Sequence, residues 1–355
     1  MKSFFYILLS IIIFSLSSCP TSLSFDDISK MSSREMIENH TRNVRRAAVT
    51  VGIVQNGEMS FTVYGENGRV LPNREHIYEI GSITKPITAQ LFARAIYENK
   101  VSLDDQIDRF LNLPAKAYYP TIRRILTHTS GYRTDYYWGI ISSTNFALAG
   151  NLWYGLTRGM ILDHIGKINL ENRDYLWEYS NFGIGVAGLV LEKIYNEDFT
   201  SLMNNYLRNT LGLQNTRISD GKGDLSNYMT WSSGNPYIPA GAIVSTITDM
   251  MKYAQMQITG MPYYVSHSHK VEAQINNVIP ELHIPELGLR IDAMGLAWFI
   301  DSVNNIIWHG GTMPQYHSYL GIDLENDIAV VVLSNIGDRI FAAQVIGAKI
   351  LKELR

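Results

Sequence analysis

A serine and a lysine stand three residues apart in the stretch EIGSITKPIT, which runs from Glu79 to Thr88. Pro86 lacks a backbone N–H and fits only the first turn of a helix, so the pattern predicts a helix that begins close to Ser82. Lys85 then lies on the same helical face as Ser82. A buried lysine loses affinity for its proton and can accept one from a hydroxyl group. The stretch therefore favours Ser82 as a nucleophile and Lys85 as its base.

The Ser-x-x-Lys spacing taken alone leaves two alternatives to a catalytic pair. Serine is favoured at helix N-caps, so an ordinary capping role also explains Ser82. The Ser-x-x-Lys spacing occurs a second time at Ser219 and Lys222, in the Gly-rich stretch SDGK, where we predict a turn. The first turn of a helix, however, has free N–H groups that supply an oxyanion donor to a nucleophile placed there. That property favours Ser82 over Ser219.

The elements that must position Ser82 follow from the periodicity of the apolar residues. Gln55, Asn56 and Gly57 separate two alternating apolar runs, which is a strong signal for a β-hairpin. Thr246 and Asp249 have the spacing of a capping box and predict the start of a further helix. Helices are predicted near residues 34–47, 86–99, 120–127, 158–167, 181–195, 199–209 and 340–354, and strands near 294–301, 305–311, 317–324 and 328–335.

Strand patterns thus lie at both ends of the chain, and helical patterns lie between them. We predict an α/β (α+β) fold in which the N- and C-terminal segments form one antiparallel sheet flanked by helices, with a mostly helical domain inserted. The sheet subdomain is expected at residues 40–85 and 240–355, and the helical subdomain at 86–239. A cleft between the two subdomains is the expected place for a site.

Composition excludes several other functions for the 355 residues. A net charge of −3 argues against nucleic acid as a partner, because no basic field is present to hold a polyanion. No Gly-x-Ser-x-Gly or His-Glu-x-x-His motif occurs. His267, His269 and His283 lie close together in the sequence but lack carboxylates at ligand spacing. We therefore predict neither a metal site nor a cofactor.

The N-terminus has the pattern of an export signal. Lys2 precedes an apolar run from Phe4 to Leu16, which is short for a membrane span and typical of a secretory signal peptide. The run leads to Cys19, the only cysteine, in a stretch that resembles a bacterial lipobox. A cleaved signal with an incidental cysteine is the alternative. The predicted units are a signal peptide at residues 1–18, a lipidated tether at 19–33 and a folded domain at 34–355.

Four further stretches follow EIGSITK in order. They are ILTHTSGY at 125–132, YSN with Tyr179 and Asn181, PAGAIVSTITDM at 239–250, and HGG with His309, Gly310 and Gly311. The shorter patterns are repeated at 97–99 (YEN) and 164–166 (HIG), but those copies end predicted helices. Together the five stretches resemble the motifs of the penicillin-recognising serine hydrolases. That family includes class C β-lactamases, D-alanyl-D-alanine carboxypeptidases and related esterases.

The resemblance implies a role for each residue of these motifs. Ser82 is the nucleophile, while Lys85 and Tyr179 share the work of general base and then acid. The substrate-binding residues implied are Asn181, His309, Gly310, Gly311 and Thr312, with the N–H groups of Ser82 and Thr312 as the oxyanion hole. The implied enzyme is a serine hydrolase of carboxypeptidase or esterase type.

Such an enzyme is expected to hydrolyse peptidoglycan-type D-amino-acid peptides, β-lactams or small acyl esters through an acyl-enzyme. Its expected partners are that small-molecule or peptidoglycan-derived substrate and a bacterial membrane, held through lipid on Cys19 and facing the periplasm or the cell exterior. The alternative function is a penicillin-binding-type receptor or envelope binding protein that acylates slowly with little turnover.

The strand motif departs from the pattern of class C β-lactamases. Those enzymes usually carry Lys-Thr-Gly, where this sequence has His309, Gly310 and Gly311. A histidine is only partly charged near neutral pH, and glycine offers no hydroxyl, so weak β-lactam hydrolysis is expected. If His309 titrates near pH 6.5, KM for carboxylate substrates should rise above about that pH. The alternative is a neutral histidine that donates one hydrogen bond.

Overall fold

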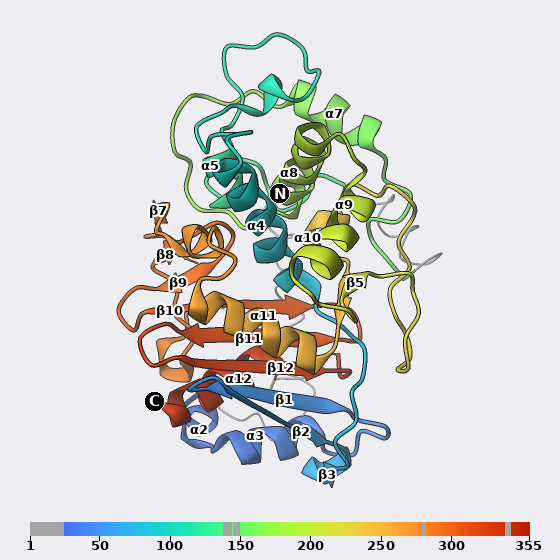
Figure 1. Ribbon diagram of the computed structural model, residues 1–355, viewed down its shortest axis with the longest axis vertical. Coiled ribbons are helices and arrows are strands. Elements are labelled where there is room, and N and C mark those ends of the chain that lie inside the picture. Colours follow the sequence, from blue (N-terminus) through green and yellow to red (C-terminus); the bar gives the residue numbers. More distant parts are fainter. Residues whose placement is uncertain (1–24, 138–143, 145–149, 279–281, 338–341) are drawn as a thin grey trace.

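The computed structural model describes residues 25–137, 144, 150–278, 282–337 and 342–355 (Figure 1). The predicted signal peptide and Cys19 lie outside the described residues. No helix among these described segments has the length and apolar character needed to cross a membrane.

A nine-stranded antiparallel sheet forms the lower half of the molecule in Figure 1. Its strand order is β3-β2-β1-β12-β11-β10-β9-β8-β7. The N-terminal strand β1 therefore pairs with the last strand, β12, with Val49 opposite Ser334. The bounds are β1 Val49–Gln55, β2 Glu58–Tyr64, β3 Val70–Leu71, β7 Ala273–Gln274, β8 Ala293–Met294, β9 Phe299–Asp301, β10 Ile306–Thr312, β11 His317–Asp323 and β12 Ile328–Ser334.

The first hairpin has the turn that its sequence predicts. Asn56 and Gly57 have φ angles of 50° and 80°, the left-handed values that a two-residue hairpin loop requires. The turn pairs Gln55 with Glu58 and continues to Val49 opposite Tyr64. The predicted antiparallel sheet built from both ends of the chain is confirmed.

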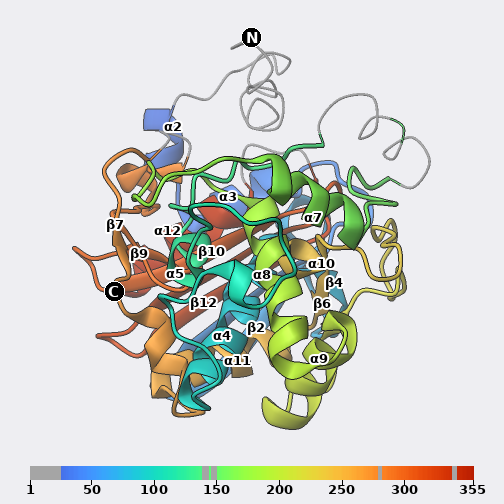
Figure 2. The same cartoon turned by 90° about the horizontal axis from the view of Figure 1, so that it is seen from above.

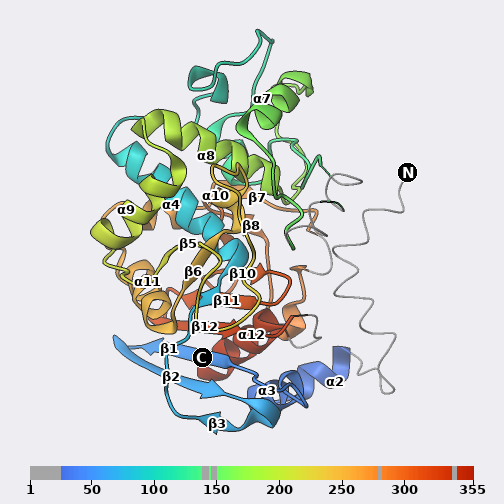
Figure 3. The ribbon, with the colours of Figure 1, turned by 90° about the vertical axis from the view of Figure 1, so that its right-hand side faces the viewer.

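Helices cover both faces of the sheet (Figure 3). α11 packs against β1, β11 and β12 on one face, and α12 packs against β10, β11 and β12 on the other, where it also meets α3. Every residue of β12 is buried, because both faces of this strand are covered. The bounds are α2 Phe25–Lys30, α3 Ser33–His40, α11 Ile247–Thr259 and α12 Ala343–Leu354.

The helical subdomain lies above the sheet, with α8 near its centre when it is viewed from that side (Figure 2). A three-stranded sheet of order β4-β6-β5 joins it to the large sheet. The bounds are α4 Thr84–Tyr97, α5 Ile122–Leu126, α7 Arg158–Lys167, α8 Asn181–Tyr195, α9 Phe199–Asn205, α10 Ile238–Gly241, β4 Tyr78–Glu79, β5 Arg217–Ile218 and β6 Ile243–Ser245. Short 3-10 turns complete it, among them η3, Gly81–Ile83.

Three local predictions were wrong in detail. The helix predicted over 34–47 ends at His40, because Asn43 and Arg46 have left-handed φ angles of 57° and 60°. The predicted irregular tether contains helix α2, and Ile28 in that helix is buried. The helix predicted at Thr246 does begin there as α11, and the Thr246 side chain accepts the Asp249 N–H at 3.4 Å. The reciprocal half of the capping box is absent, because the Asp249 carboxylate accepts hydrogen bonds from residues 215 and 216 instead.

Candidate active site

Ser82 lies on η3, which leads directly into α4. Gly81 precedes it with a φ of 50°, and a Cβ atom built on Gly81 would lie 2.9 Å from the backbone nitrogen of Thr312. Glycine at this position lets η3 approach strand β10 closely. The N-cap of α4 is Ile83, and no side chain caps this helix. Ser82 is therefore not an ordinary helix cap.

Lys85 reaches back from the first turn of α4 to Ser82. Its Nζ donates to Ser82 Oγ at 2.8 Å and to the Ala240 carbonyl, in α10, at 2.7 Å. The lysine side chain has no solvent exposure. Burial holds its pKa well below the usual value, because a charged ammonium is poorly solvated there. The predicted serine–lysine pair is thus in hydrogen-bond contact.

Tyr179 enters from the other side of Ser82. Ser180 caps α8 through its Oγ, which accepts from the Gly183 N–H at 2.8 Å, and so fixes the residue before the helix. The Lys85 ammonium lies 4.8 Å from the centroid of the Tyr179 ring. Burial raises the pKa of Tyr179, and a hydrogen bond with the Ser82 side chain opposes that shift. The tyrosine is therefore a neutral phenol at Ser82.

Asn181 is the first residue of α8, two positions after Tyr179. Its backbone N–H donates to the Thr134 carbonyl at 3.1 Å. Thr134 in turn donates its hydroxyl to the Tyr179 carbonyl at 2.6 Å. The YSN stretch is therefore anchored to the loop that follows ILTHTSGY, and Asn181 begins α8.

Strand β10 forms the opposite wall. A Cβ atom on Gly311 would lie 2.0 Å from the Ile80 carbonyl oxygen, so only glycine permits this contact between β10 and the chain entering η3. Ser318 on β11 donates its hydroxyl to the same carbonyl at 2.7 Å. Thr312 N lies close to Gly81, the residue before Ser82. The HGG stretch therefore meets the serine side.

Gly310 points to the other face of β10. A Cβ atom there would lie 2.5 Å from Cγ of Gln344, on α12. Gln344 fills the space that a threonine side chain would need, and its Nε2 donates to Thr312 Oγ1 at 3.3 Å. A larger residue at position 310 would therefore have to displace the Gln344 side chain.

His309 is buried and stacks on Phe299, with ring centroids 4.4 Å apart. Its Nδ1 lies 2.7 Å from the Gly310 carbonyl, which can only accept, so Nδ1 carries the proton and Nε2 does not. Burial lowers the pKa of His309 to about 3, and the charge of Lys85 adds to that effect. The predicted titration near neutral pH was therefore wrong, because His309 is desolvated beside a cation.

Sequence reasoning missed two groups that touch this machinery. The Ala240 carbonyl holds Lys85, and the ring of His128 lies 4.7 Å from that of Tyr179, centroid to centroid. Both residues fall inside stretches already identified as familial, PAGAIVSTITDM and ILTHTSGY. The motifs therefore identified the segments that contain these two groups but not the individual atoms that make the contacts.

The alternative motifs lie elsewhere. Ser219 accepts a hydrogen bond from the Gly221 N–H at 3.2 Å, and Lys222 is exposed, so SDGK is a turn as predicted. Nε2 of His269 is hydrogen-bonded to Gln257 at 2.9 Å. Among the residues that the structure describes, no group of three or more potential ligands could hold a metal ion.

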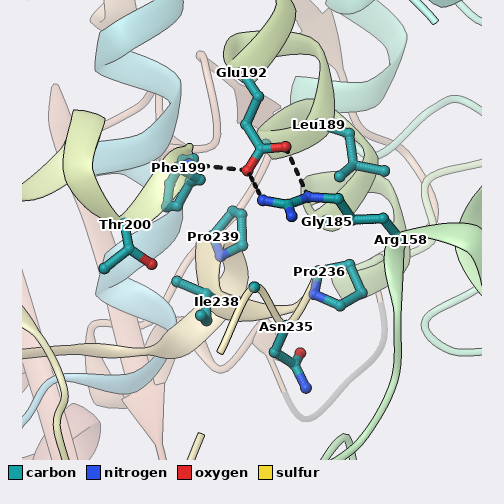
Figure 4. A pocket seen from close by; sticks show the side chains of 12 residues that line it. Arg158, Gly185, Leu189, Glu192, Phe199, Thr200, Asn235, Pro236, Ile238 and Pro239 are labelled. Atoms are coloured by element: carbon teal, nitrogen blue, oxygen red, sulfur yellow. Dashed lines mark hydrogen bonds and ion pairs between the residues drawn. The ribbon is translucent and has the colours of Figure 1, made fainter. Parts of the chain in front are cut away.

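A small cavity between α8 and α10 is also separate from Ser82 (Figure 4). An ion pair between Arg158 and Glu192 spans it, and Glu192 also accepts the Phe199 N–H at 2.9 Å. Its polar groups satisfy one another, so it serves the packing of the helical subdomain.

Known proteins with this fold share its size and arrangement. The penicillin-binding protein homologue from Pyrococcus abyssi has a TM-score of 0.69 at 19% identity, over 90% of this chain and 75% of that one. A β-lactamase/D-alanine carboxypeptidase from Yersinia pestis has a TM-score of 0.70 at 16% identity, over 90% and 95%. D-amino acid amidase from Ochrobactrum anthropi has a TM-score of 0.66 at 18% identity, over 91% and 98%.

Sequence comparison gives the same family. Protein flp of Staphylococcus aureus (strain COL) is 21% identical over 85% of this chain, which spans only 62% of that relative's length. A β-lactamase of Providencia stuartii is 24% identical over 57% of this chain and 50% of its own. The family model described as Beta-lactamase matches residues 34–354. The chain therefore belongs to the beta-lactamase family of serine hydrolases, as its five motifs predicted.

Proposed function

We propose that this protein hydrolyses its substrate through a covalent acyl-enzyme on Ser82. The observation that carries the proposal is the 2.8 Å contact between Lys85 Nζ and Ser82 Oγ, made by a lysine with no solvent exposure. A lysine in that environment is neutral at a lower pH than usual and can take the serine proton.

The proposed reaction has two steps. In the first, Ser82 Oγ attacks the acyl carbon while its proton passes to Lys85, and the N–H groups of Ser82 and Thr312 stabilise the oxyanion. Tyr179, a phenol hydrogen-bonded to Ser82, passes its proton to the leaving group as the bond to that group breaks, and Lys85 hands the serine proton on to Tyr179, so both residues are neutral again. In the second, water attacks the acyl carbon and gives its proton to Lys85, the bond between Ser82 Oγ and the acyl carbon breaks, the proton passes to Ser82 Oγ, and the acid is released.

For the substrate, we propose small acyl esters or amides over β-lactams. A neutral His309 supplies no cation for a carboxylate, and its unprotonated Nε2 would face a carboxylate with a lone pair. Gly310 supplies no hydroxyl that could bind a carboxylate. Carboxypeptidase activity on D-amino-acid peptides remains within the same chemistry, because it uses the same acyl transfer.

The test compares purified protein on p-nitrophenyl butyrate, a D-amino-acid amide, a D-Ala-D-Ala peptide and nitrocefin. Turnover of the ester or amide with slow nitrocefin hydrolysis supports the proposal. Efficient nitrocefin hydrolysis contradicts the substrate preference. Stoichiometric labelling by fluorescent penicillin without turnover of any substrate would favour a penicillin-binding receptor instead.

We also propose that Cys19 carries lipid and anchors the protein to a bacterial membrane from outside the cytoplasm. The support is the single cysteine that follows the apolar run of a signal peptide. Two acyl chains on one residue give stable anchoring. Wild-type protein should partition into the detergent phase of Triton X-114, whereas Cys19→Ser should not, and a mature N-terminus at another residue would contradict the proposal.

A further inference from the structure

His128 contacts the residues on both sides of Tyr179 and the tyrosine itself. The His128 carbonyl accepts the Glu178 N–H at 2.9 Å, and its Nδ1 accepts the Ser180 N–H at 3.1 Å. The His128 and Tyr179 rings pack with centroids 4.7 Å apart and planes inclined by 42°. One side chain and its own carbonyl therefore hold three consecutive residues.

This arrangement depends on an unusual backbone. His128 has a φ of 60°, in the left-handed region that is uncommon for residues other than glycine, although asparagine, aspartate and histidine are enriched there. It follows α5, whose end is closed by a hydrogen bond from the His128 N–H to the Ile125 carbonyl at 3.2 Å. The turn aims both the carbonyl and the ring of His128 toward the segment that carries Tyr179.

The acceptor role of the ring is fixed by its partner. A backbone N–H can only donate, so Nδ1 must hold a lone pair and the imidazole must be neutral. The ring is buried, and burial holds the pKa of His128 well below its usual value, with the charge of Lys85 adding to the effect. His128 thus keeps its acceptor throughout the neutral range and takes no part in proton transfer.

Tyr179 needs such support, because its approach is irregular. The segment before it lies between α7, which ends at Lys167, and α8, which begins at Asn181. The hydroxyl of Tyr179 must meet Ser82 Oγ, and a displacement of about 1 Å can cost 10²-fold in rate. The Tyr179 carbonyl itself accepts a hydrogen bond from the Thr134 hydroxyl, while His128 binds the backbone of the residues on either side of the tyrosine.

We propose that His128 is a positioning residue for Tyr179, which it holds against Ser82 by accepting the N–H of Ser180 and of Glu178. The proposal rests on the acyl-enzyme function proposed above for Ser82. No proton passes through His128, so its contribution should disappear when the tyrosine hydroxyl is absent.

Two variants separate the acceptor from the ring. His128→Leu keeps a bulky side chain and removes the acceptor, whereas His128→Asn places an amide oxygen near the position of Nδ1 and tolerates the left-handed backbone. On p-nitrophenyl butyrate, His128→Leu should lower kcat by about 10- to 100-fold, with little change in KM. His128→Asn should recover most of the loss. Equal kcat in His128→Leu and wild type, or no recovery by His128→Asn, would overturn the proposal.

The decisive measurement repeats His128→Leu in a Tyr179→Phe background. If His128 acts through the tyrosine hydroxyl, the second substitution should lower the residual rate by less than about threefold, since two parts of one unit are not additive. The same loss in both backgrounds would show general packing and would overturn the proposal. Should His128→Leu fail to fold, His128→Gly relieves the backbone and removes the acceptor, and the same outcomes apply.

A separate readout distinguishes this proposal from the function on which it rests. Fluorophosphonate labelling of wild type that is absent in Ser82→Ala supports the acyl-enzyme function. If that labelling is present but His128→Leu is labelled as fast as wild type, only the positioning role fails. If wild type is not labelled at all, the proposed function fails first.

Discussion

Burial has opposite consequences on the two sides of Ser82, the helical wall that carries Lys85 and the strand wall that carries His309. On the helical side, burial lowers the pKa of Lys85, which favours the neutral amine that the proposed reaction requires. On the strand side, burial lowers the pKa of His309 to about 3 and so removes the positive charge that this position would need to bind a carboxylate. Desolvation disfavours the charged form in both places.

The difference separates the wall proposed to carry out proton transfer from the wall that would bind a substrate carboxylate. Proton transfer requires a lysine that gives up its charge, and the helical wall provides the contacts for it. Carboxylate recognition requires a group that keeps its charge, and His309 on the strand wall lacks one. The contrast predicts a protein that retains the acyl-transfer machinery and has changed the class of substrate that it accepts.

The largest expected effect tests whether Ser82 is the nucleophile. Ser82→Ala should abolish fluorophosphonate labelling and lower turnover on the order of 10⁴-fold or more, as for other nucleophile deletions. Ser219→Ala is the matched control, because it has the same spacing to a lysine but lies in a turn. Labelling that persists in Ser82→Ala, or that depends on Ser219, would refute the assignment.

A second substitution asks whether Lys85 acts as a base or only as a charge. Lys85→Arg keeps the positive charge but cannot lose its proton, so kcat should fall by roughly 10²- to 10⁴-fold. In wild type, activity should increase as pH rises through the lowered pKa of Lys85, because the neutral amine is the reactive form. A pH–rate profile that keeps this rise in Lys85→Arg would contradict the prediction.

The effect of burial on the pKa of a charged group can also be measured at Glu79, which belongs to neither wall. Burial raises the pKa of Glu79, on β4, to about 7 from 4.5. The folded state then holds this proton more tightly than the unfolded chain, so the free energy of unfolding falls as pH rises from about 4.5 to about 7. The shift corresponds to about 3 kcal/mol.

Glu79→Gln should remove that loss, because an amide has no proton to release and its oxygen can still accept the Met229 N–H. Urea denaturation at pH 5 and pH 8 measures the difference. Glu58→Gln, at an exposed position on β2, is the control and should change neither value. If the wild type is equally stable at the two pH values and Glu79→Gln leaves both unchanged, the prediction fails.

The smallest expected effect concerns the strand wall. With His309 neutral, KM for a D-Ala-D-Ala peptide and KM for p-nitrophenyl butyrate should show parallel pH dependence between about pH 5 and 9. His309→Lys should lower KM for the carboxylate substrate roughly fivefold, the value of one partly screened ion pair, and leave the ester unchanged. A KM that rises near pH 6.5 for the peptide alone would show that His309 titrates there.

Much of this architecture could be predicted from the sequence, because it depends on local patterns. The Asn56-Gly57 turn, the start of α4 near Ser82 and the strand ending in HGG each have their own signal. The charge state of His309 has none, since it depends on Phe299 and Lys85, which come from different elements. The contacts of His128 were hidden for the same reason, because its hydrogen-bond partners Glu178 and Ser180 lie 50 and 52 residues later in the chain.

The pairing of β1 with β12 also determines when, during synthesis, the Ser82 site can form. Val49 pairs with Ser334, so a chain made from its N-terminus must wait for nearly all of its length before β1 has a neighbour on that side. The position of Ser82 depends on segments that are also synthesised late, because η3 packs closely against Gly311 and Thr312 of β10. Pairings this distant form slowly. A half-synthesised chain therefore lacks the strand contacts that hold Ser82 in place.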